Sequence, residues 1–341
     1  MLKTLTNIDA VSGNESNIRK FIIDKVRDFV TTCETDTIGN VILFKKGNNP
    51  SGQKVAVFAH MDEVGLIVND ITDDGYLKFS HVGGIDDRIL LAQRVKVGEN
   101  KIKGVIGIKA VHLQTEDERK NVIKCADMYI DIGAKSKDEA LRMVSKGDYI
   151  SFDSQFTELY NTKFKAKAID DRAGCAINLD LVKKEYAEDI FFCFTVQEET
   201  GLRGASVLSR RIDPDIAIIL EATTASDTAF SPPHMYGTTL GGGPVITNMD
   251  MGAYQDKKLK NFIIDTANNE NITFQYKLTS NGGNDSRQIQ TGASGARVCS
   301  VSLPCRYIHS PVCVADMQDY ESMKKLVEKT LENIHTFAKT L

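Results

Sequence analysis

The fold of this chain is constrained most strongly by three predominantly apolar runs, at residues 55–60, 190–196 and 217–221. Such a run is typical of a strand buried on both faces, whereas a half-exposed strand alternates apolar and polar residues. The first run ends in His60, and the third ends in Glu221. Open α/β sheets bind ligands at the carboxyl ends of their strands. The sequence therefore predicts an α/β fold, with a mixed sheet flanked by helices and a functional site at its strand ends.

Two acidic pairs also follow predicted strands. Asp170 and Asp171 lie between an alternating strand and an apolar helix, and Glu198 and Glu199 follow the run at 190–196. Burying isolated carboxylates costs free energy, and metal coordination is a common reason for several of them to converge. A single acidic pair is more often a solvated turn. The prediction of a site therefore depends on which other residues converge with these pairs.

The pattern of predicted secondary structure changes between residues 69 and 162. Short β-like segments separated by Gly and Asp turns dominate there, with a single predicted helix at 136–144. We expect residues 1–68 and 163–341 to form one discontinuous α/β domain, and residues 69–162 to form a small β-rich domain inserted into it. Four residues of the insertion lack a strand-end context and are interpreted as turn or surface residues: His81, Asp86, Asp87 and His112.

Local signals predict three further elements. Residues 12–15 have the form of a capping box that opens an amphipathic helix extending to about residue 30. Residues 272–278 are expected to form a strand, and the amphipathic pattern at 316–341 predicts a final helix.

Composition narrows the classes of function. The 341 residues carry a formal charge of −4, which favours neither nucleic acid nor an anionic membrane as a partner. No apolar run approaches the roughly 20 residues that span a bilayer. The N-terminus lacks the apolar core of a secretory signal. The seven cysteines contain no CxxC pair and are interpreted as reduced core residues, so we expect a cytoplasmic protein.

The polar residues that follow predicted strands form one candidate constellation: His60, Asp170, Glu198, Glu199, Glu221 and His309. Nitrogen and oxygen ligands without a thiolate suit zinc, cobalt or manganese. Two ions that share one bridging carboxylate use five of these six side chains and leave the sixth as a general base. Such a site holds a hydroxide between two Lewis acids, so the residues alone favour hydrolysis of an amide or an ester.

Four motifs make the sequence recognisable. Residues 59–65 (AHMDEVG), 169–172 (IDDR), 196–205 (VQEETGLRGA) and 306–311 (RYIHSP) closely resemble those of the tetrahedral (TET) aminopeptidases. This family includes glutamyl, leucyl and deblocking aminopeptidases, and its genes often carry an old endoglucanase label. The resemblance covers essentially the whole chain. It implies a zinc-peptidase-like catalytic domain with a PDZ-like insertion, assembled from dimers into a tetrahedral dodecamer.

The resemblance also implies a ligand set for two divalent ions, zinc or cobalt, with manganese as a further possibility. Asp170 resembles the bridging ligand. His60 and Glu221 would hold one ion, and Glu199 and His309 would hold the other. The chain departs from many members of the family in one ligand, because Glu221 stands where they have aspartate.

Two catalytic roles follow from the same resemblance. Glu198 would be the general base, which takes a proton from the metal-bound water and passes it to the leaving amine. Asp62 would orient the imidazole of His60. Asp171 would follow the bridging residue through what is commonly a cis peptide bond.

The expected substrates are short peptides with a free N-terminus, from which the enzyme removes N-terminal residues. We expect the pocket for the first side chain to draw on the loops at 283–287 and 241–244. Arg287 is expected on the surface, and the preference for the first residue is expected to be broad or neutral.

Two rival functions remain open at this stage. A glycosidase needs only two carboxylates, which leaves His60, His309 and Glu221 without a role. A catalytically silent assembly protein usually loses the base or a ligand, whereas this chain retains all of them. Chelation of the metal distinguishes a glycosidase from a metallopeptidase. It abolishes the activity of a metallopeptidase, whereas a glycosidase that uses only carboxylates stays active.

Overall fold

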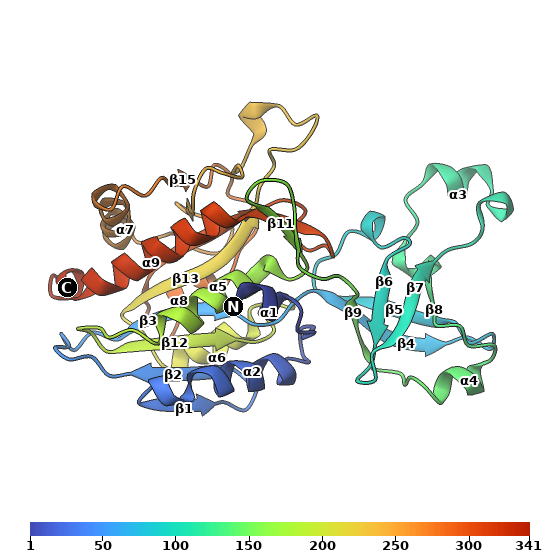
Figure 1. Cartoon of the computed structure of the whole chain (residues 1–341), viewed down its shortest axis with the longest axis horizontal. Coiled ribbons are helices and arrows are strands. Elements are labelled where there is room, and N and C mark those ends of the chain that lie inside the picture. The colour runs from blue at the N-terminus through green and yellow to red at the C-terminus, as the bar shows by residue number, and fades with distance from the viewer.

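The computed structural model describes all of residues 1–341. The chain folds into a larger part, which contains both termini, and a smaller part made from residues 65–152 (Figure 1). None of the helices combines the length and the apolar character that crossing a bilayer requires.

An eight-stranded mixed sheet forms the middle of the larger part. Its four central strands, β12, β3, β13 and β16, are parallel, whereas β1, β2 and β14 each pair with an antiparallel neighbour. In spatial order, the strands are β1 (Thr32–Thr35), β2 (Val41–Lys45), β12 (Ile190–Thr195), β3 (Val55–His60), β13 (Ile216–Thr224), β16 (Arg297–Cys305), β14 (Val245–Ile246) and β15 (Gln275–Tyr276). A three-stranded sheet lies beside it and contains β10 (Thr157–Glu158), β11 (Lys163–Ala166) and β17 (Cys313–Asp316).

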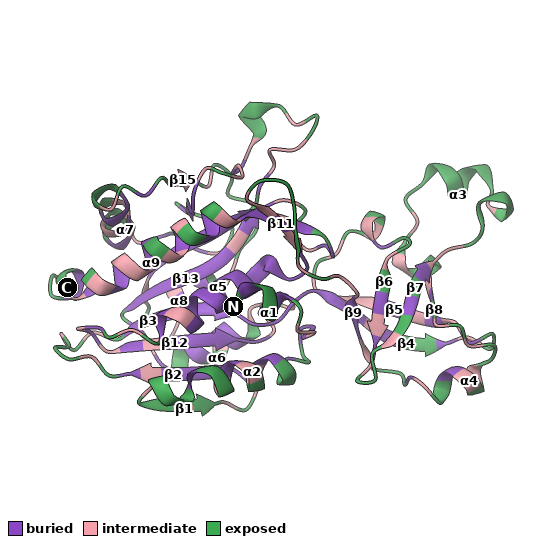
Figure 2. Cartoon of the chain, viewed as in Figure 1, coloured by how far each residue is buried: buried purple, intermediate pink, exposed green.

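Helices cover both faces of the large sheet. The central strands are buried inside the larger part (Figure 2). In β3, Val57 packs into the core on one face of the sheet and Phe58 into the core on the other, and both are fully buried. The apolar run at 55–60 is therefore confirmed as a strand buried on both faces. The first core contains α1 (Leu2–Thr6), α2 (Ser16–Val26), α5 (Ile169–Leu181), α7 (Lys257–Asn269) and α9 (Met317–Ala338), and the second contains α6 (Arg203–Arg211) and α8 (Ser286–Gln290).

The smaller part is a closed six-stranded barrel with its own apolar core. The barrel begins at Gly65, so its first strand starts four residues before the boundary expected at residue 69. Two short helices lie in it, α3 and α4, where the sequence predicted one. The elements are β4 (Gly65–Ile71), β5 (Leu77–Val82), β6 (Arg94–Val97), β7 (Ile102–Gly107), α3 (Glu116–Lys120), β8 (Tyr129–Asp131), α4 (Lys137–Leu141) and β9 (Tyr149–Phe152).

The predicted capping box at residues 12–15 is wrong. Helix α2 begins at Ser16, and no side chain caps it. The Ser12 hydroxyl instead lies 3.0 Å from the Thr200 hydroxyl, and Glu15 accepts the backbone N–H of Gln197 at 3.2 Å. The side chains of Ser12 and Glu15, which a local cap would have used, therefore contact the segment after β12.

The other local predictions had mixed outcomes. The final helix is confirmed as α9, with Asp316 as its N-cap accepting the backbone N–H of Gln318. The strand predicted at 272–278 is reduced to the two residues of β15, because its only ladder partner, β14, is equally short. Helix α7 begins at Lys257, and Asp256 caps it by accepting the backbone N–H of Leu259.

Candidate metal centre

The parallel strands bring the predicted site residues to one edge of the large sheet. His60 is the last residue of β3 and pairs in register with Thr195, the last residue of β12. Glu221 lies in β13, which is the neighbour of β3 on its other side. His60 and Glu221 therefore lie close together, and the chain that leads from Thr195 to Glu198 and Glu199 starts beside them, because the three strands are adjacent.

Asp170 lies between two histidines. Its Oδ1 is 3.2 Å from Nε2 of His60, and its Oδ2 is 3.4 Å from Nε2 of His309. A second carboxylate accompanies each imidazole: Glu221 Oε2 is 3.7 Å from His60 Nε2, and Glu199 Oε2 is 3.4 Å from His309 Nε2. Within each group of three, one potential ligand atom per residue lies within 4.8 Å of the others. All five side chains expected to bind metal are thus brought together.

The segment around Asp170 is held rigidly by buried contacts. The peptide bond between Asp170 and Asp171 is cis, as the resemblance led us to expect. Asp171 Oδ1 accepts the backbone N–H of Gly174, where an added Cβ would lie 2.4 Å from the Asp171 carboxylate. Arg172 is fully buried and donates to the backbone carbonyls of Met61, Leu5 and Ile8. The IDDR motif therefore anchors the start of α5 while leaving Asp170 directed at the histidines.

Asp62 contacts the acidic pair through the main chain. Its two carboxylate oxygens accept the backbone N–H groups of Glu198 at 3.0 Å and of Glu199 at 3.2 Å. Its Oδ1 is also 3.5 Å from Nδ1 of His60, which is long for a hydrogen bond. Asp62 thus lies beside His60 as expected, but its well-formed bonds hold the loop that follows β12.

Burial dominates the electrostatics of the carboxylates. It raises the pKa of Glu198 and of Glu221 well above the ordinary value, and raises that of Glu199 to about 8. Burial by itself lowers the pKa of His309, but the hydrogen bond to Asp170 raises it to about 9. The site therefore holds more buried acids than its two histidines can neutralise.

This donor set fits divalent cations. Oε1 of Glu221 is shielded from solvent and has no hydrogen-bond partner, so an acceptor is available in the interior. Buried carboxylates with no matching positive charge are stabilised by a bound cation. The longer side chain that this chain carries at position 221 still reaches the group formed with His60 and Asp170.

The comparisons with known proteins agree with this geometry. Residues 39–326 match the model of the M42 glutamyl aminopeptidase family. A lysyl aminopeptidase of Pyrococcus furiosus is 34% identical over 98% of this chain and 96% of its own length.

The chain belongs to the M42 glutamyl aminopeptidase family. Among solved structures, a TET aminopeptidase from the marine sediment archaeon Thaumarchaeota archaeon SCGC AB-539-E09 has a TM-score of 0.95 and 32% identity, covering 99% of this chain and 97% of that one. The Pyrococcus horikoshii TET1 peptidase, described as assembling into a tetrahedron or a large octahedral shell, has a TM-score of 0.86 and 34% identity, covering 97% and 98%. The family expected from the sequence motifs is confirmed, and so is the assignment of the chain to the hydrolases.

A pocket of about 150 Å³ opens beside the metal centre of this family member. Sequence reasoning missed one charged residue of the lining, Lys277, and assigned no role to Asp285, which belongs to the expected loop at 283–287 but lies behind the lining. Lys277 lines the pocket and donates to the carbonyl of Asn281 at 2.9 Å. Asp285 is buried, accepts the Thr195 hydroxyl at 2.6 Å, and has a pKa that burial raises to about 6. Lys277 could have been found only from its nearness in sequence to the glycine-containing loop at 281–284.

The loops expected to line the pocket differ in their outcome. Gly283 and Asn284 are part of the lining, whereas the segment 241–244 is not. The backbone N–H groups of Gly241 and Gly243 instead bind the carboxylate of Asp319 in α9. Arg287 is exposed outside the lining, as expected.

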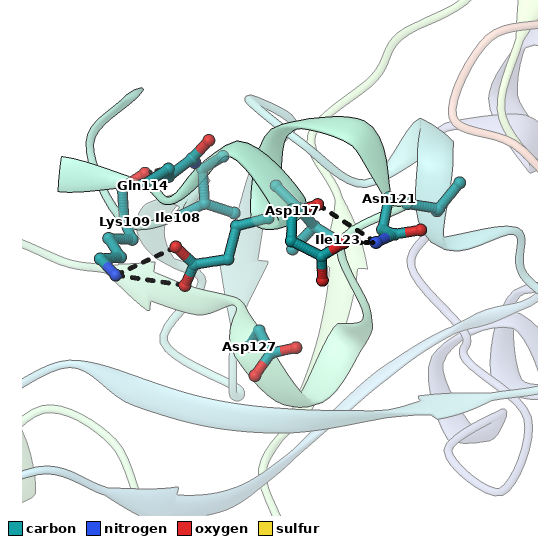
Figure 3. A pocket seen from close by; sticks show the side chains of 9 residues that line it. Ile108, Lys109, Gln114, Asp117, Asn121, Ile123 and Asp127 are labelled. Atoms are coloured by element: carbon teal, nitrogen blue, oxygen red, sulfur yellow. Dashed lines mark hydrogen bonds and ion pairs between the residues drawn. The ribbon is translucent and has the colours of Figure 1, made fainter. Parts of the chain in front are cut away.

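Another pocket, of about 340 Å³, lies beside α3 in the segment that connects β7 to β8 (Figure 3). Lys109 and Glu118 form an ion pair of 3.1 Å across it, and Asn121 donates to Asp117. The lining contains no histidine, no cysteine and no residue of the metal centre. We therefore assign the pocket no catalytic role.

Proposed function

We propose that this M42 family member is a dinuclear metallo-aminopeptidase that removes N-terminal residues from short peptides with a free N-terminus. One observation carries the proposal: the two oxygens of Asp170 face different histidines, 3.2 Å from His60 and 3.4 Å from His309. A carboxylate in that position is suited to bridge two ions. We expect zinc or cobalt, with manganese as a further possibility.

The five ligand candidates divide into two sets that share Asp170. His60 and Glu221 would complete one set, and Glu199 and His309 the other. When bound, such a pair of ions supplies Lewis acidity that activates water and polarises a peptide carbonyl. The protein contributes the positions of the ligands, which are set by strand ends and by the rigid start of α5.

Glu198 is the proposed general base. Its side chain lines the pocket beside the ligands, and burial raises its pKa well above the ordinary value. A carboxylate with a raised pKa accepts a proton from water more readily and can then donate it to the leaving amine. Asp62 acts as a positioning residue, because it holds the backbone N–H of Glu198 and of Glu199.

The lining of the pocket supports a substrate with a free amine. Four carboxylates of the metal centre, those of Asp170, Glu198, Glu199 and Glu221, border the same space. An ammonium group is attracted to such a surface, whereas a blocked N-terminus has no charge to place there. This electrostatic match favours an aminopeptidase over an endopeptidase.

The assembly and the domain division are part of the proposal. Residues 1–68 and 163–341 would form the catalytic domain, and the PDZ-like insertion at 69–162 would mediate a dimer that assembles into a tetrahedral dodecamer. The shells formed by the Pyrococcus horikoshii relative support this assembly, as do the exposed side chains of Val111 and Leu113 on the barrel. All seven cysteines are free, which supports a location in the cytoplasm.

The test uses metal-stripped protein and a panel of aminoacyl-p-nitroanilides. Adding Zn²⁺ or Co²⁺ is expected to restore cleavage, and Glu198→Gln is expected to abolish it while leaving metal binding intact. Glu185→Gln is the matched control, because the side chain of Glu185 is 81% exposed and only pairs with Lys45. Light scattering of the same preparation gives the mass of the assembly.

Other outcomes would support the rivals. Hydrolysis of a glycoside that survives chelation would identify a carboxylate-only glycosidase. Full metal binding without cleavage of any peptide substrate would identify a silent assembly protein. Failure to bind metal would overturn the interpretation of the site.

A further inference from the structure

Three residues of the barrel converge at a second place with metal-ligand chemistry. His81 lies in β5, Asp87 begins the short helix Asp87–Ile89, and Cys125 begins the short helix Cys125–Asp127. One potential ligand atom from each lies within 4.8 Å of the others. The sequence analysis interpreted His81 and Asp87 as turn or surface residues. The fold instead leaves them only partly exposed and brings them to the same thiol.

The contact between His81 and Asp87 leaves both of its atoms without a hydrogen bond. Nε2 of His81 and Oδ1 of Asp87 are 3.2 Å apart, and both are shielded from solvent without satisfying hydrogen-bond geometry. Lys124 lies 3.8 Å from the other oxygen of Asp87, Oδ2, so Oδ1 remains available. Two potential ligand atoms this close together, neither of them in a hydrogen bond, are suited to share a cation.

Cys125 completes the donor set with a sulfur atom. Its thiol donates to the carbonyl of Phe79 at 3.5 Å, so the sulfur lone pairs remain available to a cation. Burial and the neighbouring Asp87 raise the pKa of Cys125 to about 11, so the thiol holds its proton until a cation is present. Metal binding would release that proton to solvent and form a sulfur–metal bond.

We propose that His81 Nε2, Asp87 Oδ1 and Cys125 Sγ bind a third divalent ion of the zinc class, separate from the catalytic pair. One nitrogen, one oxygen and one thiolate suit Zn²⁺ or Co²⁺ and disfavour Mg²⁺ and Ca²⁺, which prefer oxygen ligands alone. A water molecule would fill the fourth position. The site would be structural, since it lies outside the pocket that contains the catalytic ligands.

The ion would anchor a segment that contacts the catalytic centre. Residues 82–86 connect His81 to Asp87, and within them the carbonyl of Gly84 accepts Nδ1–H of His309 at 3.0 Å. A Cβ added to Gly83 would lie 3.3 Å from Cβ of Glu199. Fixing both ends of this segment would hold His309 and Glu199 in place. This consequence rests on the proposed function, whereas the third site does not.

The experiment is a Co²⁺ titration of the metal-stripped full chain, followed by absorption in the near ultraviolet. A thiolate bound to Co²⁺ produces a charge-transfer band, and nitrogen and oxygen ligands do not. We expect three Co²⁺ ions per chain and a band that develops with one of them. Cys125→Ser is expected to lose the band and one ion, and His81→Gln is expected to weaken the same step.

Matched cysteine variants identify the thiol. Cys33→Ser, in the edge strand β1 of the large sheet, should retain the band. Cys313→Ser should also retain it, although Cys313 borders a space that includes Asp170 and His309. The proposal is overturned if the wild type shows no band at saturation, if the band survives in Cys125→Ser, or if it disappears in Cys313→Ser. An ion pair between His81 and Asp87 would give the first of these results.

A further variant separates this proposal from the proposed function. Asp170→Asn should lose peptidase activity and catalytic metal but retain the thiolate band, because Asp170 belongs only to the catalytic groups. Peptidase activity that persists in Asp170→Asn would overturn the dinuclear mechanism and leave the third site standing. Loss of the band in Asp170→Asn would instead overturn the independence of the third site.

Discussion

Asp62 and Glu198 follow neighbouring parallel strands, and Oδ1 of Asp62 accepts the backbone N–H of Glu198 at 3.0 Å. The second oxygen accepts the backbone N–H of Glu199 at 3.2 Å. A fully buried carboxylate thus fixes the main chain of the acidic pair relative to the strand that carries His60. Because both bonds reach the backbone, Asp62 positions the proposed base and one proposed ligand together.

Asp62→Asn is expected to weaken metal binding by about 10- to 100-fold, as is typical when a residue that orients ligands is changed. Asparagine has one acceptor oxygen, so one of the two backbone N–H groups loses its partner. Competition with a chromophoric chelator gives the affinity, and kcat at saturating metal gives the effect on Glu198. An unchanged affinity would show that the loop after β12 needs no such anchor.

Metal affinity is expected to rise with pH. In the metal-free protein, Asp170 and Glu199 raise the pKa of His309 to about 9 against the effect of burial, and burial raises that of Glu199 to about 8. Below those values both groups hold protons that must leave before they ligate. Affinity should therefore increase with pH by about tenfold per pH unit for each proton released. Titration calorimetry in buffers of different ionisation enthalpy counts the protons; a count of zero would contradict the expectation.

Lys277 is expected to favour substrates whose first side chain is acidic. Its amine lines the pocket beside the metal centre, and burial lowers its pKa while Asp250 and Glu221 oppose that effect. Lys277→Met should lower the ratio of glutamyl- to leucyl-p-nitroanilide cleavage by about tenfold, ~1.4 kcal/mol. Arg287→Met is the matched control, since Arg287 lies outside the lining. Equal ratios in the wild type and Lys277→Met would restore the broad preference expected from the sequence.

The buried ion pair between Lys167 and Glu63 is expected to be costly to break. Lys167 Nζ donates to both oxygens of Glu63, at 2.7 and 2.6 Å, and both side chains are buried. Lys167→Met leaves Glu63 without this partner, which typically costs about 3–5 kcal/mol. We expect the lower end, because the Ala10 N–H and the Arg172 guanidinium also face Glu63. Urea denaturation followed by tyrosine fluorescence measures the loss, and Lys167→Met with Glu63→Leu should recover part of it.

Sequence by itself determined the class of fold and named the side chains of the candidate site. The apolar run at 55–60 predicted a strand buried on both faces, because each strand position that faces the protein interior carries an apolar residue. The motifs around Asp170, Glu198 and His309 indicated the family and named the side chains to examine. These signals are local, so a single pass along the chain detects them.

Tertiary structure alone decided how these residues meet. His309 follows β16, yet it reaches Asp170 at the start of α5 and the Gly84 carbonyl in the barrel. His81 and Cys125 likewise lie in the same cluster although they are 44 residues apart in the sequence, and no sequence motif connects them. Because of long-range packing, the Ser12 hydroxyl contacts Thr200 and does not cap a helix. Within residues 272–278, only two residues form a strand. Local periodicity sets which face of an element is apolar, but distances between elements depend on packing that no short window of sequence contains.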